Sequence, residues 1–172
     1  MKLDYIVFDT PLGWMGVSGS PKGLRRLVLP QSSQEQALRL LCECDLKQRG
    51  QYLSEAEAGY FDDLPDRMRD YLAGKVVGFP DKLDLSWASL FQTSVWEITQ
   101  SIPHGETRTY YWVADKLGMP KAARAVGQAL ARNPVPIIVP CHRVICRDGS
   151  LGGFGGGEDV KRLLLEIEAK AK

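Results

Sequence analysis

Hydrophobic and polar positions alternate in three short runs near the start of the chain, the period typical of half-buried strands. Turn-forming stretches, "TPLG" and "GSPKG", separate these runs. The predicted strands cover residues 4–10, 13–18 and 24–29. The spacing then becomes helical over 33–45 and 58–73, and the second helix ends at Gly74. Residues 1–88 are therefore predicted to form a small α/β domain on an antiparallel hairpin sheet, with "GKVVGFPDKLDLSW" as strand or loop.

The second half of the chain has a mainly helical pattern. Within 89–101 the apolar residues fall along one stripe, and Pro103 ends this helix. The stripe contains Leu90, Val95, Ile98 and Ile102. Two shorter helices, 109–117 and 121–132, are joined by a turn that contains Gly118, which is typical of a helix-turn-helix. Many such units only pack against a core, so this pattern leaves both roles open.

The predicted helix 121–132 has two different faces. Its apolar stripe contains Ala122, Val126 and Leu130, at intervals of four residues. Arg124 lies about 200° around the helix from that stripe. Its neighbours on the outer face are small or uncharged: Ala123, Gly127, Gln128 and Ala131. A nearly bare face with one long cation suits close approach to a phosphate backbone, whereas the alternative is a solvated, alanine-rich face.

The distribution of charged residues along the chain is more informative than the net charge. The net charge is only +1, but residues 108–147 carry seven basic side chains and one acidic one, Asp115. Such a local excess is typical of a surface that binds a polyanion, although a solvated basic face would look the same. We find no run of eighteen apolar residues and no apolar signal-peptide core at the N-terminus. The expected compartment is the cytoplasm, or the nucleus in a eukaryote.

The chain has four cysteines, which a reducing compartment would keep as thiols. Cys42 and Cys44 have the wrong spacing for a zinc knuckle, and the only histidines are His104 and His142. We therefore expect no metal and no cofactor.

The stretch "NPVPIIVPCHRVICRDG" carries the candidate chemistry. Its apolar run "VPIIVP" is predicted to be a short buried strand that delivers Cys141 and His142 to a pocket wall. A cysteine is a nucleophile only as its thiolate, and a nearby histidine can take the proton. Glu168, in a predicted helix 158–170, borders the apolar stripe and can orient that histidine. The stripe consists of Val160, Leu164 and Ile167. An inert buried thiol, a Cys–His hydrolase and a binding module with a vestigial cysteine are the alternatives.

Several spaced motifs resemble one known family. "FQTSVWEITQSIPHGETRTY", "KAARAVGQALARNP", "PVPIIVPCHRVI" and "LGGFGGGEDVKRLLLEIE" are similar, in this order, to segments of the O6-alkylguanine-DNA alkyltransferases. The resemblance covers about residues 89–168, whereas 1–88 match only in general character. It implies a ribonuclease H-like α/β domain at 1–88, and a mainly α, winged-helix-like domain with a helix-turn-helix at 89–172.

The resemblance also implies roles for individual residues. Cys141 is expected to accept the alkyl group in a single, irreversible turnover. His142 is expected to take the thiol proton through a water, and Glu168 to orient His142. Asn133 would brace the helix-turn-helix against the active-site segment, and Tyr110 would hydrogen-bond guanine N3. The backbone carbonyls of Cys141 and Val144 would accept from the exocyclic amine of the base.

The same resemblance implies how DNA is held. Arg124 is expected to enter the duplex and replace the extruded nucleotide, since an alkyl group within the stack is out of reach. The other expected DNA contacts are Ala123, Gly127, Thr109 and Lys121. Val144, Gly155 and Phe154 are expected to line the base pocket. Phe154 stands where many relatives have tyrosine, and the glycines at 155–157 remove a side chain that some relatives carry there. This departure affects the bulky alkyl groups that the pocket can accept and not the reaction itself.

The glycine-rich "LGGFGGG" lacks the Lys-Ser/Thr of a P-loop and is interpreted as a pocket loop. The expected partner is double-stranded DNA containing O6-alkylguanine, with O4-alkylthymine as an open second substrate. We expect a monomer that contacts no membrane.

Overall fold

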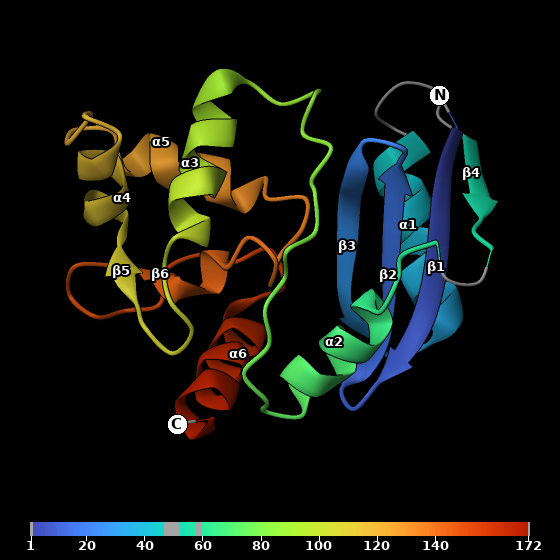
Figure 1. Ribbon diagram of the computed structural model, residues 1–172. Helices are drawn as coiled ribbons and strands as arrows, with labels where there is room; N and C mark the ends of the chain where they lie inside the picture. Colours follow the sequence, from blue (N-terminus) through green and yellow to red (C-terminus); the bar gives the residue numbers. More distant parts are fainter. Residues whose placement is uncertain (1, 47–51, 58–59, 172) are drawn as a thin grey trace. The chain divides into compact units, whose positions relative to one another are not determined.

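The computed structural model describes residues 2–46, 52–57 and 60–171 (Figure 1). The chain divides into two compact units, Met1–Leu85 and Ser86–Lys172. The boundary predicted from the sequence lies three residues later, between 88 and 89. Of the helices described, none is both long enough and apolar enough to cross a membrane.

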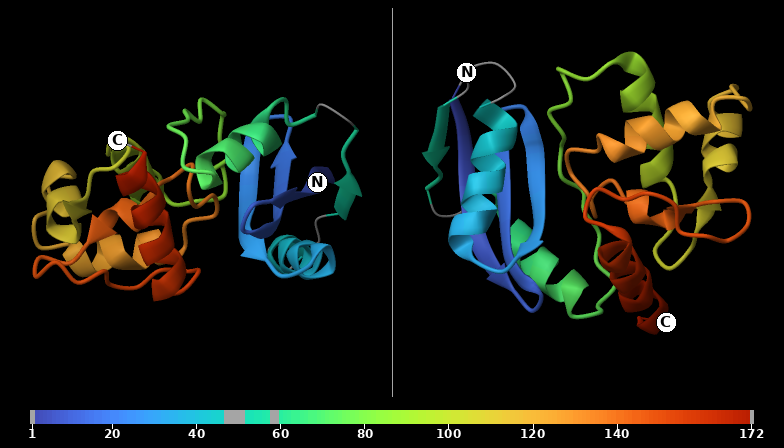
Figure 2. Two further views of the ribbon diagram at one scale, coloured as in Figure 1. Left: turned by 90° about the horizontal axis from the view of Figure 1, so that it is seen from below. Right: turned by 180° about the vertical axis from the view of Figure 1, so that it is seen from behind.

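The first unit is a four-stranded mixed sheet with a helix on each face. Its strands are β1 (Lys2–Thr10), β2 (Gly13–Ser20), β3 (Gly23–Gln31) and β4 (Tyr52–Glu55). They lie in the order β3-β2-β1-β4, with β4 parallel to β1 and the other pairs antiparallel. Helix α1 (Gln34–Leu46) covers one face and α2 (Leu64–Leu72) the other, as the views from below and behind show (Figure 2). The three predicted strands are confirmed, whereas the short β4 was not predicted.

Helix α2 is shorter than the prediction of 58–73. Residues 60–63 form turns, and 58 and 59 lie outside the described residues. Asp62 has a positive φ of 48°, which a helix does not allow, and Pro65 stands in the first turn of α2. These two residues fix the start of the helix at Leu64.

The segment after α2 returns to the sheet as a loop. Leu24 donates its backbone N–H to the Lys82 carbonyl at 2.8 Å, and Asp84 donates to the Leu24 carbonyl at 2.7 Å. A side chain at Gly23 would place its Cβ 2.3 Å from the Lys82 oxygen, so glycine is required there. The Asp84 carboxylate accepts from Ser20 Oγ at 2.7 Å and from Arg25 Nη1 at 3.1 Å, all in the interior.

The second unit packs helices around the segment that contains Cys141. Its elements are α3 (Leu90–Gln100), β5 (Arg108–Thr109), α4 (Tyr110–Lys116), α5 (Ala123–Ala131), the 3₁₀ turn η1 (Cys141–Arg143), β6 (Val144–Ile145) and α6 (Glu158–Lys170). Ser89 and Gln92 form a capping box at the start of α3. The indole of Trp96, fully buried on α3, donates to the Ala129 carbonyl of α5 at 3.0 Å. This contact anchors α5 to the core.

Two predicted apolar stripes are wrong in detail. Leu90 was expected to face inward but is 89% exposed, because it occupies the first turn of α3 and the buried face begins at Val95. On α6 the buried face consists of Lys161, Leu164 and Glu168, and not of Val160, Leu164 and Ile167. Glu168 therefore lies in the middle of the buried face instead of at its border.

The run "VPIIVP" is buried, as expected, but it is not a strand. Val139 donates its N–H to the Val135 carbonyl at 2.9 Å, and Ile137 has a positive φ of 76°. Prolines at 134, 136 and 140 lack the N–H groups that a sheet needs. The chain therefore forms a compact buried turn that leads directly into η1.

Candidate active site

Cys141 and His142 occupy a 3₁₀ turn instead of a strand, in which adjacent side chains would face opposite ways. The Cys141 N–H donates to the Val139 carbonyl at 2.7 Å, and the Arg143 N–H donates to Pro140 at 2.9 Å. Cys141 is 6% exposed and His142 is fully buried. Beyond the turn, β6 pairs in parallel with β5, so Val144 lies beside Arg108.

Asn133 connects the end of α5 to the cysteine. Its amide Nδ2 lies 3.0 Å from Cys141 Sγ and 2.8 Å from the Val139 carbonyl, to which it donates. Its Oδ1 accepts from the Val135 N–H at 3.0 Å. The predicted bracing residue therefore contacts both the buried turn and the thiol itself.

Glu168 is held from three directions. Its Oε1 lies 2.8 Å from His142 Nε2. The Arg143 guanidinium donates to both carboxylate oxygens, and the Gly105 N–H donates to Oε2 at 2.9 Å. Burial opposes ionisation of Glu168, but the hydrogen bonds from His142 and Arg143 outweigh it and hold the pKa of the carboxyl well below its usual range. Glu168 is therefore a carboxylate at any working pH.

An ionised Glu168 determines which nitrogen of His142 carries the proton. A carboxylate only accepts hydrogen bonds, so Nε2 must be the donor and Nδ1 keeps the lone pair. Burial lowers the pKa of His142, and this exceeds the opposing effect of Glu168. The imidazole is thus neutral near pH 7, as a general base must be.

The thiol rests in its protonated form. Burial raises the pKa of Cys141 above its ordinary value. The Asn133 amide, the charge of Lys161 and the backbone N–H groups of Cys141 and His142 act in the opposite direction, since each stabilises the thiolate. Cys141 is therefore a thiol at rest and must lose its proton to a base before it can react. The same surroundings then stabilise the thiolate that forms.

Lys161 is a buried cation that the sequence analysis did not assign. It is fully buried, and its Nζ donates to the carbonyls of Val144 and Leu151, the first at 2.6 Å. Its ammonium also lies 5.7 Å from the centre of the Tyr110 ring. Its helical position gave a signal, because Lys161, Leu164 and Glu168 share one face of α6. Arg143 and Gly105 contact Glu168 across long sequence separations, so no local pattern in the sequence predicts these contacts.

A cavity of about 680 Å³ lies in the second unit, and Tyr110, whose ring centre is 5.7 Å from Lys161 Nζ, is one of its lining residues. The whole outer face predicted for the helix at 121–132 lines it: Ala123, Arg124, Gly127, Gln128 and Ala131. Tyr110, Tyr111, Cys146 and Arg147 form further walls, with Phe154 and glycines 152, 153 and 155. The bare face of α5 is therefore the wall of a cavity, and Arg124 is exposed at it.

Tyr110 belongs both to the cavity and to the surroundings of the thiol. Burial first, then the proximity of Cys146 and Cys141, raises the pKa of Tyr110 to about 12. Its phenol is therefore a hydrogen-bond donor throughout the neutral range. A Cβ at Gly152 would lie 3.0 Å from the Tyr110 oxygen and 3.1 Å from Cys146 Sγ, whereas one at Gly153 or Gly155 would meet nothing within 4 Å. The glycine loop is thus tight at 152 and open at the two other positions.

The remaining predicted site residues lie at different depths. Val144 is fully buried, and its carbonyl, a predicted acceptor for the base, already accepts from Lys161. Thr109 caps α4 by accepting from the Trp112 N–H at 3.1 Å. Lys121 is exposed in the turn before α5 and is not among the residues lining the cavity. Val144, which was predicted to line the base pocket, is likewise not among the residues lining the cavity.

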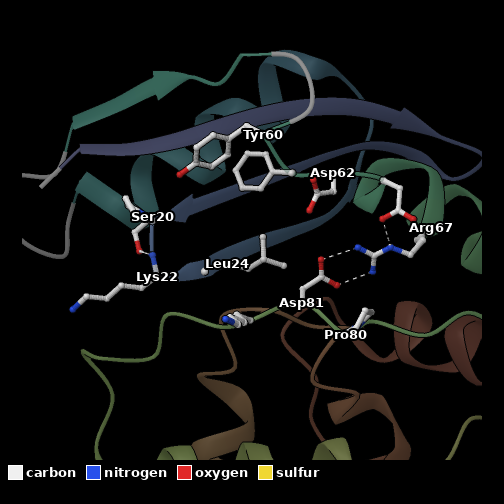
Figure 3. Close-up of a pocket in the computed structure, with 13 residues that line it drawn as sticks. Ser20, Lys22, Leu24, Tyr60, Asp62, Arg67, Pro80 and Asp81 are labelled. Atoms are coloured by element: carbon white, nitrogen blue, oxygen red, sulfur yellow. Dashed lines mark hydrogen bonds and ion pairs between the residues drawn. The ribbon is translucent and has the colours of Figure 1, made fainter.

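A second cavity, of about 540 Å³, lies within the first unit (Figure 3). Arg67 donates to both oxygens of Asp81 at 2.7 Å and to Asp63 at 2.7 Å, as the dashed lines show. Arg67 thus pairs with two acidic residues that line this cavity, and the pair with Asp81 links α2 to the segment that follows it. In the part of the chain that the structure describes, no three His, Cys, Asp or Glu side chains gather as metal ligands would.

Comparisons with known proteins agree with this geometry. A family model for "6-O-methylguanine DNA methyltransferase, DNA binding domain" matches residues 90–170. The methylated-DNA–protein-cysteine methyltransferase of Mycobacterium tuberculosis H37Rv is 39% identical over 166 residues, which are 96% of this chain and 92% of that protein. The protein of the same name from Methanosarcina acetivorans is 36% identical over 95% of this chain and 97% of its own length.

Solved structures show the same relationship. The M. tuberculosis OGT, crystallised in complex with DNA, superposes with a TM-score of 0.78 at 37% identity, covering 99% of this chain and 94% of that one. The O6-methylguanine-DNA methyltransferase of Pyrococcus kodakaraensis has a TM-score of 0.69 at 25% identity, over 96% and 98% of the two chains. A cysteine-dependent alkyl acceptor is the class of protein that this fold and site define. The chain belongs to the methylated-DNA–protein-cysteine methyltransferase family, which confirms the resemblance found in the sequence.

Proposed function

We propose that this protein repairs O6-alkylguanine in double-stranded DNA by transferring the alkyl group irreversibly to its own Cys141. Two contacts at consecutive buried residues carry this proposal: the Asn133 amide lies on the thiol of Cys141, and the neutral imidazole of His142 lies on the carboxylate of Glu168. Because the thioether product is stable, each molecule acts once. The transfer, as proposed, uses these side chains and no cofactor.

The chemical step is a displacement at an sp³ carbon. His142 Nδ1 takes the thiol proton through a water, since Nε2 is held by Glu168. Cys141 Sγ forms a bond to the alkyl carbon while the bond from that carbon to O6 breaks, and its electron pair passes to the purine. The proton finally reaches guanine N1, so atoms and charge balance. Asn133 and Lys161 stabilise the thiolate meanwhile.

Tyr110 assists the departure of the base. Its high pKa keeps the phenol protonated, so it can donate to guanine N3 as negative charge develops on the purine. The carbonyls of Cys141 and Val144 would accept from the exocyclic amine. Phe154 and Gly155 line the cavity that would receive the extruded base.

Base extrusion assigns a role to the cavity-lining face of α5. We assign α4 and α5 to a helix-turn-helix that inserts Arg124 into the duplex, with Ala123 and Gly127 allowing close approach and Thr109 and Lys121 contacting the backbone. The exposed Arg124 beside the cavity supports this arrangement. The base would enter the cavity as the arginine fills its place.

The sheet order β3-β2-β1-β4, with parallel β1 and β4, supports a ribonuclease H-like first domain. The four α-helices and the β5–β6 pair support a winged-helix-like second domain. We place the monomeric protein in the cytoplasm, or in the nucleus of a eukaryote, where DNA lies and thiols stay reduced.

The two alternative functions fit the site less well. A module that only recognises damaged DNA does not require His142 as a buried general base oriented by Glu168. A Cys–His hydrolase has no use for the arginine-bearing wall of α5.

Intact-protein mass spectrometry tests the proposal. The protein is mixed with one equivalent of duplex carrying a single O6-methylguanine, and the peptides are then mapped. We expect one added methyl group on the Cys141 peptide and no turnover beyond one equivalent. Cys141→Ala should bind the duplex without a mass change, while Cys146→Ala, which alters the cavity thiol, should still be methylated. Tight binding of the unaltered protein with no mass change would favour the recognition module. A duplex with O4-methylthymine tests the second substrate.

A further inference from the structure

Arg147 lies flat against Tyr111 at the wall of the large cavity. Its guanidinium carbon is 4.0 Å from the centre of the Tyr111 ring, the shortest such contact among the described residues. Both residues line the cavity, together with Arg124 from α5. A stack of this kind fixes the orientation of a guanidinium while leaving its N–H groups available along the edge.

Among the described residues, no carboxylate forms an ion pair with Arg147. Three of the other five arginines of this unit have carboxylate partners: Arg108 pairs with Glu106, Arg143 with Glu168, and Arg162 with Glu158, whereas Arg124 and Arg132 share the unpaired state of Arg147 within the described residues. For Arg147, the residues that the structure describes provide the tyrosine ring and no salt bridge. The exposed Arg147 therefore keeps its full charge at the cavity.

The neighbouring acid, Asp148, is hydrogen-bonded within its own loop. Asp148 accepts from Ser150 twice, from its backbone N–H at 3.0 Å and from its hydroxyl at 2.6 Å. These bonds lower the pKa of Asp148 and use one carboxylate oxygen within the loop. Cys146 and Ser150 close the same loop, with the Cys146 N–H donating to the Ser150 carbonyl at 2.9 Å. Arg147 thus projects from a short closed loop, which limits its movement.

We propose that Arg147, held by Tyr111, binds a DNA phosphodiester next to the extruded nucleotide. This inference rests on the proposed function. A base that enters the cavity leaves its own flanking phosphates at the mouth, because the sugar cannot follow the base into an apolar pocket. A guanidinium presents paired N–H donors that match two phosphate oxygens. Arg124 and Arg147, on different elements lining one cavity, would then hold the duplex and the extruded strand separately.

The expected effect is a change in the salt dependence of DNA binding. Each phosphate contact contributes about 0.9 to the slope of log affinity against log salt concentration. Arg147→Gln should therefore reduce this slope by about 1 for duplex containing O6-methylguanine, measured by fluorescence anisotropy. Arg147→Lys should restore the slope but not the full affinity, since a lysine keeps the charge and loses the planar stack. Tyr111→Leu should likewise keep the slope and weaken binding.

The matched control is Arg162→Gln. Arg162 is 55% exposed on α6, pairs with Glu158 and does not line the cavity, so the same change of charge should leave the slope unaltered. An unchanged slope in Arg147→Gln, or an equal change in Arg162→Gln, would overturn the inference.

Measuring alkyl transfer from free O6-methylguanine distinguishes two effects of Arg147→Gln, the loss of a phosphate contact and a change in the shape of the pocket. The free base has no phosphate, so Arg147→Gln should lower transfer from the duplex about tenfold more than transfer from the base. Equal losses on the two substrates would mean that Arg147 only shapes the cavity. If the unaltered protein gains no methyl group from either substrate, the proposed function itself fails, which is a different outcome.

Discussion

Lys161 Nζ lies 2.6 Å from the carbonyl oxygen of Val144, in the interior of the second unit. The same ammonium donates to Leu151, at the start of the glycine loop. One buried cation thus joins α6 to the strand that follows the nucleophile and to the loop that lines the cavity. Its charge also stabilises the thiolate of Cys141.

Lys161→Met should slow alkyl transfer at least tenfold. Methionine fills a similar volume but removes the charge, so the pKa of Cys141 should rise further above its ordinary value. The pH dependence of Cys141 alkylation by iodoacetamide reports this shift, which a merely structural role would not produce. Arg162→Met, one residue along on the exposed side of α6, is the control. An unaltered thiol titration in Lys161→Met would contradict the assignment.

The transfer rate should stay constant from alkaline pH down past the ordinary histidine pKa of about 6.5. Burial lowers the pKa of His142, and only the neutral imidazole can take the thiol proton. The rate should therefore fall only at a pH below that ordinary value, where the ring becomes protonated. Single-turnover rates between pH 5 and 9 would show this, and a decline centred above the ordinary value would contradict it.

Glu168→Gln should lower the transfer rate about 100-fold, within the usual range for the loss of a general base. A glutamine amide can present its N–H to His142 and reverse the tautomer, which removes the lone pair from Nδ1. The change also leaves Arg143 without its carboxylate, at a cost of about 3 kcal/mol in the free energy of unfolding. Glu166→Gln, on the exposed side of the same helix, should change neither quantity.

Arg124→Ala should slow transfer from duplex DNA much more than transfer from free O6-methylguanine. The arginine is needed only where a nucleotide must be extruded and replaced, at a cost of a few kcal/mol. A parallel measurement of both rates checks this expectation. Equal losses on both substrates would show that Arg124 acts within the pocket instead of in the duplex.

Asp84→Asn should destabilise the first unit by about 3 kcal/mol, because it leaves the buried guanidinium of Arg25 without its charge partner. Urea unfolding followed by tryptophan fluorescence measures the change. Asp70→Asn breaks an exposed ion pair with Lys75 and should cost under about 1 kcal/mol. Similar losses in the two variants would mean that burial of the Arg25–Asp84 pair has little effect.

Local sequence signals were sufficient wherever the residues concerned act close together along the chain. Strand alternation located β1, β2 and β3, and helix spacing placed Arg124 opposite the apolar stripe of α5. The prediction failed at "VPIIVP", where β-branched residues favoured a strand, whereas its two prolines and the proline at 134 lack the N–H groups that a strand needs. It also failed at β4, whose four residues form a strand only because β1 offers a free edge in parallel.

The sequence by itself located the first three strands and most of the helices, and it indicated Cys141 as the nucleophile and DNA as the polyanion to expect. Each of these depends on residues that are adjacent or on one helix face. Only the tertiary structure decided the tautomer of His142, the burial of Lys161 and the stack of Arg147 on Tyr111. These features depend on desolvation and on the direction of side chains from separate elements. A charged residue has no fixed pKa or partner until the fold removes water from around it.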